Sequence, residues 1–292
     1  IPNTETLQEI MDSPMVSLLI GTGGEGMVKL LMASKKKVIA AGPGNPPTIV
    51  DETADVKRAA ATLYQNVPVE NNMLCITEKE AFVVEQVYDE FMAEKRRLGA
   101  RVLTPEEVEK VVAASLHQEE NGKYVANKNM VGRDANVVLA NAGVTPSEGD
   151  LRLAIIEADP GNPFVCCEQM MPIFPVVKCK DFEEAMELAV KAEGGCRHSA
   201  AIWSNDIDRV TRFGKRVETT CFVQNGCTAA ATGMGGTGTG SATIATGTGE
   251  GFTNPSTFTR VRRFAMAHGG GYIVEQEPNH LTGEQKISHR KP

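Results

Sequence analysis

Aromatic residues are scarce in this chain of 292 residues, where they make up 5% and include a single tryptophan. A surface that stacks nucleic-acid bases on aromatic rings is therefore not expected. Basic residues are also too few for a polyanion partner, because 30 Lys and Arg against 37 Asp and Glu leave a net charge of -7. Apolar residues at 41% and charged residues at 23% are ordinary for a globular protein and exclude a disordered chain.

The cysteines lack the spacing of a disulfide framework or a zinc site. Their number is odd, and the sequence contains neither a CxxC pair nor a CxxC and HxxxH combination. The five histidines show no metal-binding pattern either, so we expect no metal. This cysteine usage favours a reducing, cytoplasmic setting. The seven positions are Cys75, Cys166, Cys167, Cys179, Cys196, Cys221 and Cys227.

Long hydrophobic runs and a targeting segment are absent as well. The longest charge-free stretch, 219–249, consists mostly of Gly, Thr and Ala, so no membrane span is expected. The first twelve residues contain three acidic residues and no basic one, which excludes a signal peptide. Because the first residue is Ile1, we expect a processed chain or a piece of a longer protein.

What the sequence does contain is an alternation of short β-branched runs with amphipathic stretches, which is typical of a parallel α/β fold. In the first third, the intervening turns at 21–26 and 42–47 are too rich in Gly and Pro to be helix or central strand. The predicted elements there are strands at 16–20 and 37–41 and helices at 27–34 and 55–67.

A second α/β unit is predicted from about residue 68 to about residue 230. Its predicted strands are 81–84, 101–103, 153–157, 164–168 and 199–204, and its predicted helices are 85–98, 105–116, 134–142, 181–192 and 207–217. The last stretch differs. Residues 257–267 alternate like a strand that could pair with another subunit, and 275–292 are polar enough to be a mobile tail.

Two glycine-rich runs are candidate ligand loops. Residues 21–26 follow a strand and open a helix, where free amides and the helix dipole can meet a phosphate or the edge of a nicotinamide. They match neither the full GxGxxG pattern nor a Walker A motif, so a plain tight turn is an equal alternative. The run 235–240 lacks a strand-turn-helix context, and we interpret it as a structural loop.

Cys75 and His198 are the candidate reactive side chains. Cys75 lies in a polar segment between a predicted helix and a predicted strand, and a cysteine becomes a covalent nucleophile as a thiolate, helped by positive charge or a helix N-terminus. Most cysteines are instead small buried hydrophobes, which is our interpretation of Cys166, Cys167 and Cys179. His198 fits a proton shuttle or a hydrogen-bonded structural role equally well.

Several segments together resemble the CoA-acylating branch of the aldehyde dehydrogenase superfamily, in particular the propionaldehyde and acetaldehyde dehydrogenases of bacterial microcompartments. The resemblance covers about residues 15 to 265. The matching segments are 19–24, 40–55, 71–80, 168–172, 196–200 and 247–251.

The resemblance implies a role for five residues. It places Cys75 as the catalytic nucleophile, Thr22, Gly23 and Gly24 in the loop beside the nicotinamide of NAD, and Glu168 as the carboxylate that binds the nicotinamide ribose. A thiolate at Cys75 would add to an aldehyde carbonyl, and hydride loss to the cofactor would leave an enzyme thioester.

The sequence departs from the hydrolytic relatives at Ala40. Those enzymes carry a Glu-Leu-Gly-Gly-Lys-Ser-Pro segment whose Glu activates the deacylating water, whereas residues 40–46 here begin with Ala40, which cannot act as a base. A general base contributes about 10²- to 10⁴-fold, so the thioester should persist until another thiol, coenzyme A by the resemblance, accepts the acyl group. The alternatives are a hydrolytic enzyme using His198 or Glu78 as the base, and a non-catalytic domain serving assembly.

The expected architecture is aldehyde dehydrogenase-like. Residues 1–67 are assigned to the second half of a Rossmann-type nucleotide-binding domain, 68–235 to a catalytic domain, 236–274 to a Gly/Thr-rich return with an oligomerisation strand, and 275–292 to the tail. The first half of the nucleotide-binding domain, with its oxyanion donor, would precede Ile1. We therefore expect the polypeptide alone to be inactive or nearly so.

The resemblance also implies partners: a short-chain aldehyde, coenzyme A, and a second copy in a homodimer or dimer of dimers. It extends to packaging in a microcompartment with its shell proteins, although 275–292 are not apolar enough to predict a packaging helix. The chain length of the aldehyde and the choice of NAD or NADP are not visible in the sequence.

Overall fold

The computed structural model describes residues 3–241 and 243–266. Residues 1–258 form one compact unit and residues 259–292 a second one. Of the second unit, residues 259–266 are described, and they form no regular helix or strand.

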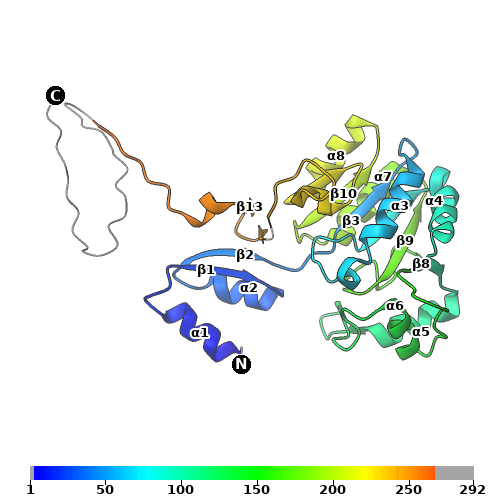
Figure 1. The fold of residues 1–292 in the computed structure, drawn as a ribbon, viewed down its shortest axis with the longest axis horizontal. Coiled ribbons are helices and arrows are strands. Elements are labelled where there is room, and N and C mark those ends of the chain that lie inside the picture. Colours follow the sequence, from blue (N-terminus) through cyan, green and yellow to red (C-terminus); the bar gives the residue numbers. More distant parts are fainter. Residues whose placement is uncertain (1–2, 242, 267–292) are drawn as a thin grey trace. The chain divides into compact units, whose positions relative to one another are not determined.

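A seven-stranded sheet is the centre of the first unit (Figure 1). Every neighbouring pair of its strands is parallel. Parallel strands buried on both faces contain few polar residues, and β4 and β10 are buried at every position. In spatial order the strands are β11 (Cys221–Gln224), β10 (Ser199–Trp203), β3 (Pro47–Val50), β4 (Glu80–Val84), β9 (Ile173–Cys179), β8 (Ala154–Ala158) and β5 (Arg101–Val102).

Four helices cover the two faces of this sheet. The connections through α3 (Val56–Asn66) and α4 (Glu85–Arg97) run toward β5, whereas those through α7 (Phe182–Glu193) and α8 (Ile207–Val217) run toward β11. Because such crossovers are right-handed, the two pairs lie on opposite faces. The contacts agree, since α3 packs on α4 and α7 packs on α8. Asp side chains accept backbone hydrogen bonds at the start of α3, α7 and α8 and fix where these helices begin.

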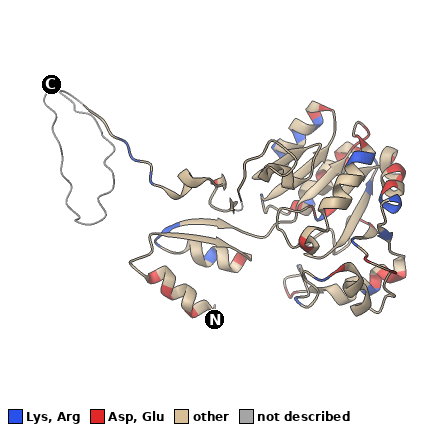
Figure 2. Ribbon diagram, viewed as in Figure 1, with Lys and Arg blue, Asp and Glu red and all other residues tan. Residues whose placement is uncertain are grey.

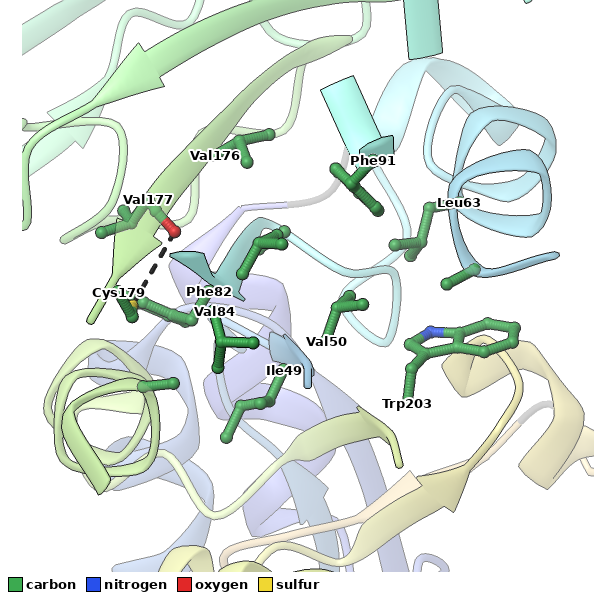
Figure 3. Close-up of a cluster of buried hydrophobic side chains, with 14 of the residues drawn as sticks. Ile49, Val50, Leu63, Phe82, Val84, Phe91, Val176, Val177, Cys179 and Trp203 are labelled. Carbon is green, nitrogen blue, oxygen red and sulfur yellow. Dashed lines mark hydrogen bonds between the residues drawn. The ribbon is translucent and has the colours of Figure 1, made fainter. Parts of the chain in front are cut away.

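The main hydrophobic core lies between the sheet and its helices (Figure 3). Val50 of β3 and Val176 of β9 are fully buried and point toward Leu63 of α3 and Phe91 of α4, which are fully buried as well (Figure 3). Large buried side chains of this kind contribute about 1.5 to 3 kcal/mol each. The core therefore holds the strands in register up to the ends that carry the candidate site.

A second core lies beside the β5 and β8 edge of the sheet. It is formed mainly by α5 (Pro105–Ser115), α6 (Ala135–Asn141) and the hairpin of β6 (Leu116–Gln118) and β7 (Tyr124–Ala126). A capping box between Thr104 and Glu107 starts α5. Figure 2 shows acidic and basic residues interspersed over the elements of the first unit rather than gathered by sign.

A smaller parallel sheet precedes the large one. It pairs β1 (Leu18–Thr22) with β2 (Lys37–Ala41), and α1 (Thr4–Asp12) and α2 (Glu25–Met32) pack against it around a small core. Short elements complete the first unit: η1 (Val69–Asn72), η2 (Thr228–Thr232), β12 (Ile244–Ala245), β13 (Gly251–Phe252) and η3 (Pro255–Phe258).

Two predicted elements differ from the structure. Residues 164–168 were expected to be extended, but they form turns, because Asn162 accepts hydrogen bonds from the backbone of Phe164 and Val165. The proline-rich segment 42–47 ends in a strand, since Pro47 begins β3. A proline is tolerated at the first residue of a strand. The small sheet ends with β2 at Ala41, and the seven-stranded sheet begins with β3 at Pro47. The boundary between the two sheets therefore lies before residue 67, where the sequence analysis placed the end of the first domain.

The predicted strand at 257–267 is not present in the described residues. Phe258 ends the short helix η3, and residues 259–266 form no strand. A strand needs a hydrogen-bonded neighbour, and none of the described residues forms a strand beside this segment. Residue 267 and the predicted tail at 275–292 lie outside the described residues.

The described part of the chain contains neither a membrane-spanning helix nor a cluster of metal-binding side chains. None of its helices is long and apolar enough to cross a membrane. It also contains no group of three His, Cys, Asp or Glu side chains placed to hold a metal ion.

Candidate active site around Cys75

The candidate site lies where four strands of the large sheet begin. Gly44, Cys75, Glu168 and His198 stand just before β3, β4, β9 and β10, respectively. Since all these strands are parallel, the four residues gather at the same edge of the sheet. Ligands of open α/β sheets usually bind at the carboxyl ends of the strands. Here the candidate site occupies the amino-terminal edge.

A strained turn leads into Cys75. Glu70, Asn71 and Asn72 have φ values of 49°, 51° and 62°, a left-handed conformation that costs of order 1 kcal/mol or more for each residue other than glycine. Side-chain amides hold the turn in place. Asn72 Nδ2 donates to the carbonyl oxygens of Val67 and Glu78 at 2.9 and 3.0 Å, and Asn71 Nδ2 donates to that of Gly132 at 2.9 Å. These hydrogen bonds therefore fix the chain before Cys75, at Asn71 and Asn72, and after it, at Glu78.

Cys75 opens onto a cavity of about 260 Å³. Thr22, at the carboxyl end of β1, lines the same cavity, so the structure brings together two residues that the sequence analysis placed in one site. None of the described residues lining the cavity carries a carboxylate. The lining residues are Thr22, Ala41, Leu74, Cys75, Ile76, Thr232, Met234, Ser241 and Ile244.

The pKa of Cys75 is set by burial, by two charged side chains, and by the backbone N–H groups of Cys75 and Ile76, which lower it. Burial of the half-buried thiol is the largest influence and raises its pKa, and the carboxylate of Glu168 raises it further. The ammonium group of Lys79 lowers it, but the sum is still an increase. In this state the thiol is favoured over the thiolate, and positive charge near Cys75 promotes the reactive form.

Glu168 is held in place by a hydrogen bond from the backbone and does not line the cavity of Cys75. Its Oε1 accepts a hydrogen bond from the backbone N–H of Gly44 at 3.3 Å. Burial raises the pKa of Glu168, while the Lys79 ammonium and the Gly44 N–H oppose that rise. Glu168 acts on Cys75 electrostatically but is not among the residues that line the cavity.

His198 is buried beside Gly44. Its backbone N–H donates to Glu193 Oε1 at 2.9 Å, its Nδ1 lies 2.8 Å from Ser199 Oγ, and its Nε2 has no hydrogen-bond partner. Burial, and then the nearby Lys79 ammonium, lower the pKa of His198 to about 4. The ring is therefore neutral at pH 7, and it is a weak base for activating water.

Glu78 is the other alternative base, but its carboxyl group is hydrogen-bonded to the backbone of Thr228. It is fully buried, and its Oε1 accepts a hydrogen bond from the backbone N–H of Thr228 at 2.6 Å. Burial raises the pKa of Glu78. Glu78 does not line the cavity of Cys75, so its carboxyl group serves to attach the segment at Thr228 to the sheet.

The predicted cofactor loop continues from Thr22 into α2. The backbone N–H of Gly23 donates to the carbonyl oxygen of Ala41 at 3.1 Å, so it pairs with the neighbouring strand. Gly24 is the N-cap of α2, and no side chain caps this helix. Ala40 is buried in β2 and donates its N–H to Thr248 Oγ1 at 3.2 Å, and the residue that lines the cavity is the next one, Ala41.

Sequence reasoning missed Lys79 and Gly44. Lys79 is fully buried between two buried glutamates, in a segment Glu-Lys-Glu that resembles an exposed charged turn. Gly44 lies against both Cys75 and His198, but its segment was interpreted only as a turn. The one signal in the sequence was the position of the charged segment, directly before the apolar run of β4. The interpretation of the other cysteines was partly wrong, since Cys167 and Cys179 are buried but Cys166 is exposed.

Comparisons with known proteins agree with this architecture. The model of the aldehyde dehydrogenase family matches residues 2–259. Acetaldehyde dehydrogenase (acetylating) EutE of Salmonella typhimurium strain LT2 is 40% identical over 267 residues, which cover 91% of this chain and 57% of that protein. Propanal dehydrogenase (CoA-propanoylating) of the same strain is 40% identical over 268 residues, 92% of this chain and 57% of that protein.

Solved structures give the same result. A propionaldehyde dehydrogenase from the Clostridium phytofermentans fucose utilisation bacterial microcompartment has a TM-score of 0.85 and 38% identity, over 91% of this chain and 60% of that one. The Rhodopseudomonas palustris propionaldehyde dehydrogenase with bound propionyl-CoA has a TM-score of 0.83 and 34% identity, over 89% of this chain and 56% of that one. The chain thus spans more than half, but less than two thirds, of the length of each of these four proteins. The predicted α/β fold and the predicted resemblance are confirmed, and the chain belongs to the aldehyde dehydrogenase family.

Proposed function

We propose that this chain supplies the nucleophile-bearing part of a CoA-acylating aldehyde dehydrogenase. The observation that carries the proposal is the cavity that joins Cys75 to Thr22 and contains no carboxylate among its described lining residues. A thioester formed at Cys75 would have no adjacent base to direct water onto it. The relatives whose names specify acetylating or CoA-propanoylating activity support the same conclusion.

The residues present fit a nicotinamide ring beside the thiol. The cavity of about 260 Å³ is too small for a whole dinucleotide but can hold a ring or a short aldehyde, and its wall is mainly aliphatic. Thr22, Gly23 and Gly24 would hold the nicotinamide end at the start of α2, and Glu168 would bind the ribose. NAD, when bound, supplies a hydride acceptor.

The chain's own residues would act in three steps. The Cys75 thiol gives its proton to water, and its sulfur then bonds to the aldehyde carbonyl carbon while the carbonyl oxygen becomes an alkoxide. The tetrahedral adduct then loses hydride from that carbon, and a thioester between Cys75 and the acyl group remains. Finally the thiol of coenzyme A attacks the thioester carbonyl, the acyl group moves to coenzyme A, and Cys75 is released. Glu168 and Lys79 bias the charge on the Cys75 sulfur in opposite directions throughout.

Other features of the proposal follow from the relatives. We include a short-chain aldehyde such as propionaldehyde or acetaldehyde as the substrate, a homodimer or dimer of dimers as the assembly, and placement in a bacterial microcompartment. The support is the activity in the names of the Salmonella relatives and the microcompartment origin of the Clostridium structure.

The acyl-transfer half of the reaction can be tested without NAD. The chain is incubated with propionyl-CoA, and the acylated peptide is located by mass spectrometry. We expect one acyl group on Cys75, lost in Cys75→Ala and kept in Cys196→Ala, whose cysteine is also half-buried. Because the polypeptide alone is expected to be nearly inactive, acylation is followed over many hours, and acylation at other cysteines only, or acylation that persists in Cys75→Ala, would reject the proposal. In the forward direction, free acid formed at full rate from propionaldehyde and NAD without coenzyme A would favour the hydrolytic alternative.

A further inference from the structure

Lys79 is a fully buried lysine whose side-chain hydrogen bonds all go to the turn in front of Cys75. Its Nζ donates to the carbonyl oxygen of Asn72 at 2.6 Å, to Asn72 Oδ1 at 2.7 Å and to the carbonyl oxygen of Leu74 at 3.1 Å. An ammonium group has three N–H donors, so these three bonds use all of them. Lys79 therefore has no donor left for the Cys75 sulfur or for an oxyanion formed from the substrate.

All three acceptors are neutral. None of the ion pairs between described residues involves Lys79, although Glu78 and Glu80 flank it in the sequence. Burying an ammonium group without an ion pair costs several kcal/mol, and a methionine would fill similar space without that cost. The charge is therefore a feature that packing alone does not explain.

The three bonds also explain how the strained turn persists. Asn72 has a φ of 62°, and its backbone carbonyl and its side-chain oxygen both accept hydrogen bonds from the same Nζ. Leu74, the residue directly before Cys75, is tied to that atom as well. A strained conformation persists only when its surroundings determine it, and Lys79 determines this one from inside the protein.

We infer that Lys79 is a positioning residue for the nucleophile: it holds the turn 72–74 in the conformation that presents Cys75 to the cavity, and its charge stabilises the Cys75 thiolate. The inference rests on the proposed function only in taking Cys75 as the nucleophile. Lys79 acts through geometry and through its electric field, and it neither donates nor accepts a proton in the reaction.

The pKa of Lys79 sets the pH range in which its ammonium charge can stabilise the Cys75 thiolate. Burial lowers the pKa of Lys79 to about 8, while Glu168, Cys75, Glu80 and Glu78 raise it. The ammonium form therefore prevails at pH 7. Lys79 in turn lowers the pKa of Cys75 and of His198.

The test measures how fast iodoacetamide alkylates Cys75 as a function of pH, with the modified peptide quantified by mass spectrometry. In Lys79→Met we expect the rate at pH 7, where Lys79 still carries its charge, to fall about tenfold, because a neighbouring opposite charge shifts a pKa by about one unit. Lys79→Arg retains the charge and should restore most of that rate, although it cannot reproduce all three hydrogen bonds.

Lys95→Met is the matched control. Lys95 is also fully buried, but its Nζ has no hydrogen-bond partner, lies 5.3 and 5.4 Å from the ring centroids of Phe91 and Phe174, and has no effect on the pKa of Cys75. We expect its alkylation profile to match the wild type.

Two results would overturn the inference. One is a folded Lys79→Met protein, checked by circular dichroism, with the wild-type rate at pH 7. The other is an equal change in Lys95→Met. If Lys79→Met does not fold, Lys79→Gln, which keeps donors but no charge, is measured instead, and an unchanged rate at pH 7 there has the same meaning. Alkylation needs neither aldehyde nor coenzyme A, so a failure of acyl transfer with a normal Lys79 effect would reject only the proposed function.

Discussion

A Cβ atom added at Gly44 would lie 2.6 Å from the carbonyl oxygen of Cys75. It would also lie 2.9 Å from Cγ of the His198 ring. The contact with Cys75 is to backbone, which cannot move aside as the tip of a long side chain can. Two segments that converge on the candidate site are thus packed against each other with no space for a methyl group.

Replacing this glycine should therefore disturb Cys75 directly. We expect Gly44→Ala to lower the free energy of unfolding in urea by about 1 to 3 kcal/mol and to change the rate at which Cys75 is alkylated. Gly42→Ala is the control, because a Cβ there would meet nothing within 4 Å. Equal stability of the two variants would show that the close approach at Gly44 is not required.

Removing the negative charge of Glu168 should make Cys75 more reactive in the absence of cofactor. The Glu168 carboxylate raises the pKa of Cys75, so Glu168→Gln is expected to shift the alkylation midpoint to lower pH, by roughly half a unit to one unit. Glu148→Gln, at an exposed position, should leave the midpoint unchanged. A shift to higher pH in Glu168→Gln would contradict the electrostatic arrangement described above.

His198 should give the protein a specific sensitivity to acid. Burial lowers its pKa from 6.5 to about 4, so between these values the unfolded chain binds a proton at His198 that the folded chain does not. The stability contributed by this residue therefore falls as the pH is lowered through that window. Between pH 7 and pH 5 we expect the wild type to lose about 2 kcal/mol more than His198→Gln.

This difference isolates His198 because the buried glutamates are the same in both proteins. Folding raises the pKa values of Glu78 and Glu80, so their contribution to the stability of the protein falls as the pH rises, which is opposite to the effect of His198. His117→Gln, at an exposed position, serves as the control and should follow the wild type. An identical pH dependence of wild type and His198→Gln would mean that folding does not lower the pKa of the buried ring.

Thr228 should stabilise the segment that carries Cys75. Its Oγ1 donates a hydrogen bond to the carbonyl oxygen of Ile76, and both groups are buried. Thr228→Val would leave that carbonyl without its partner, which costs about 1 to 3 kcal/mol in unfolding free energy. Thr211→Val removes a comparable bond to Ile207 on the exposed face of α8 and should cost clearly less. Urea unfolding of both variants provides the comparison, and equal losses would speak against a special role for Thr228.

The sequence alone determined much of the local structure and singled out Cys75 as the candidate nucleophile. Alternating apolar runs predicted β2 at its observed bounds and α3, α4, α7 and α8 to within about two residues at each end, because periodicity and N-capping act over a few neighbouring residues. The family resemblance selected Cys75 and Thr22, and the structure places both on one cavity. Their assigned chemical roles remain predictions.

Only the tertiary structure decided which residues surround Cys75. Gly44, Glu168 and His198 come from distant segments, and they meet because the strands that follow them are parallel neighbours. Lys79 looks like a surface charge in the sequence, since no local pattern reveals that its segment is enclosed on all sides. Local residue preferences define helices and strands, but the environment that sets the pKa of a thiol depends on the packing of elements far apart in the chain.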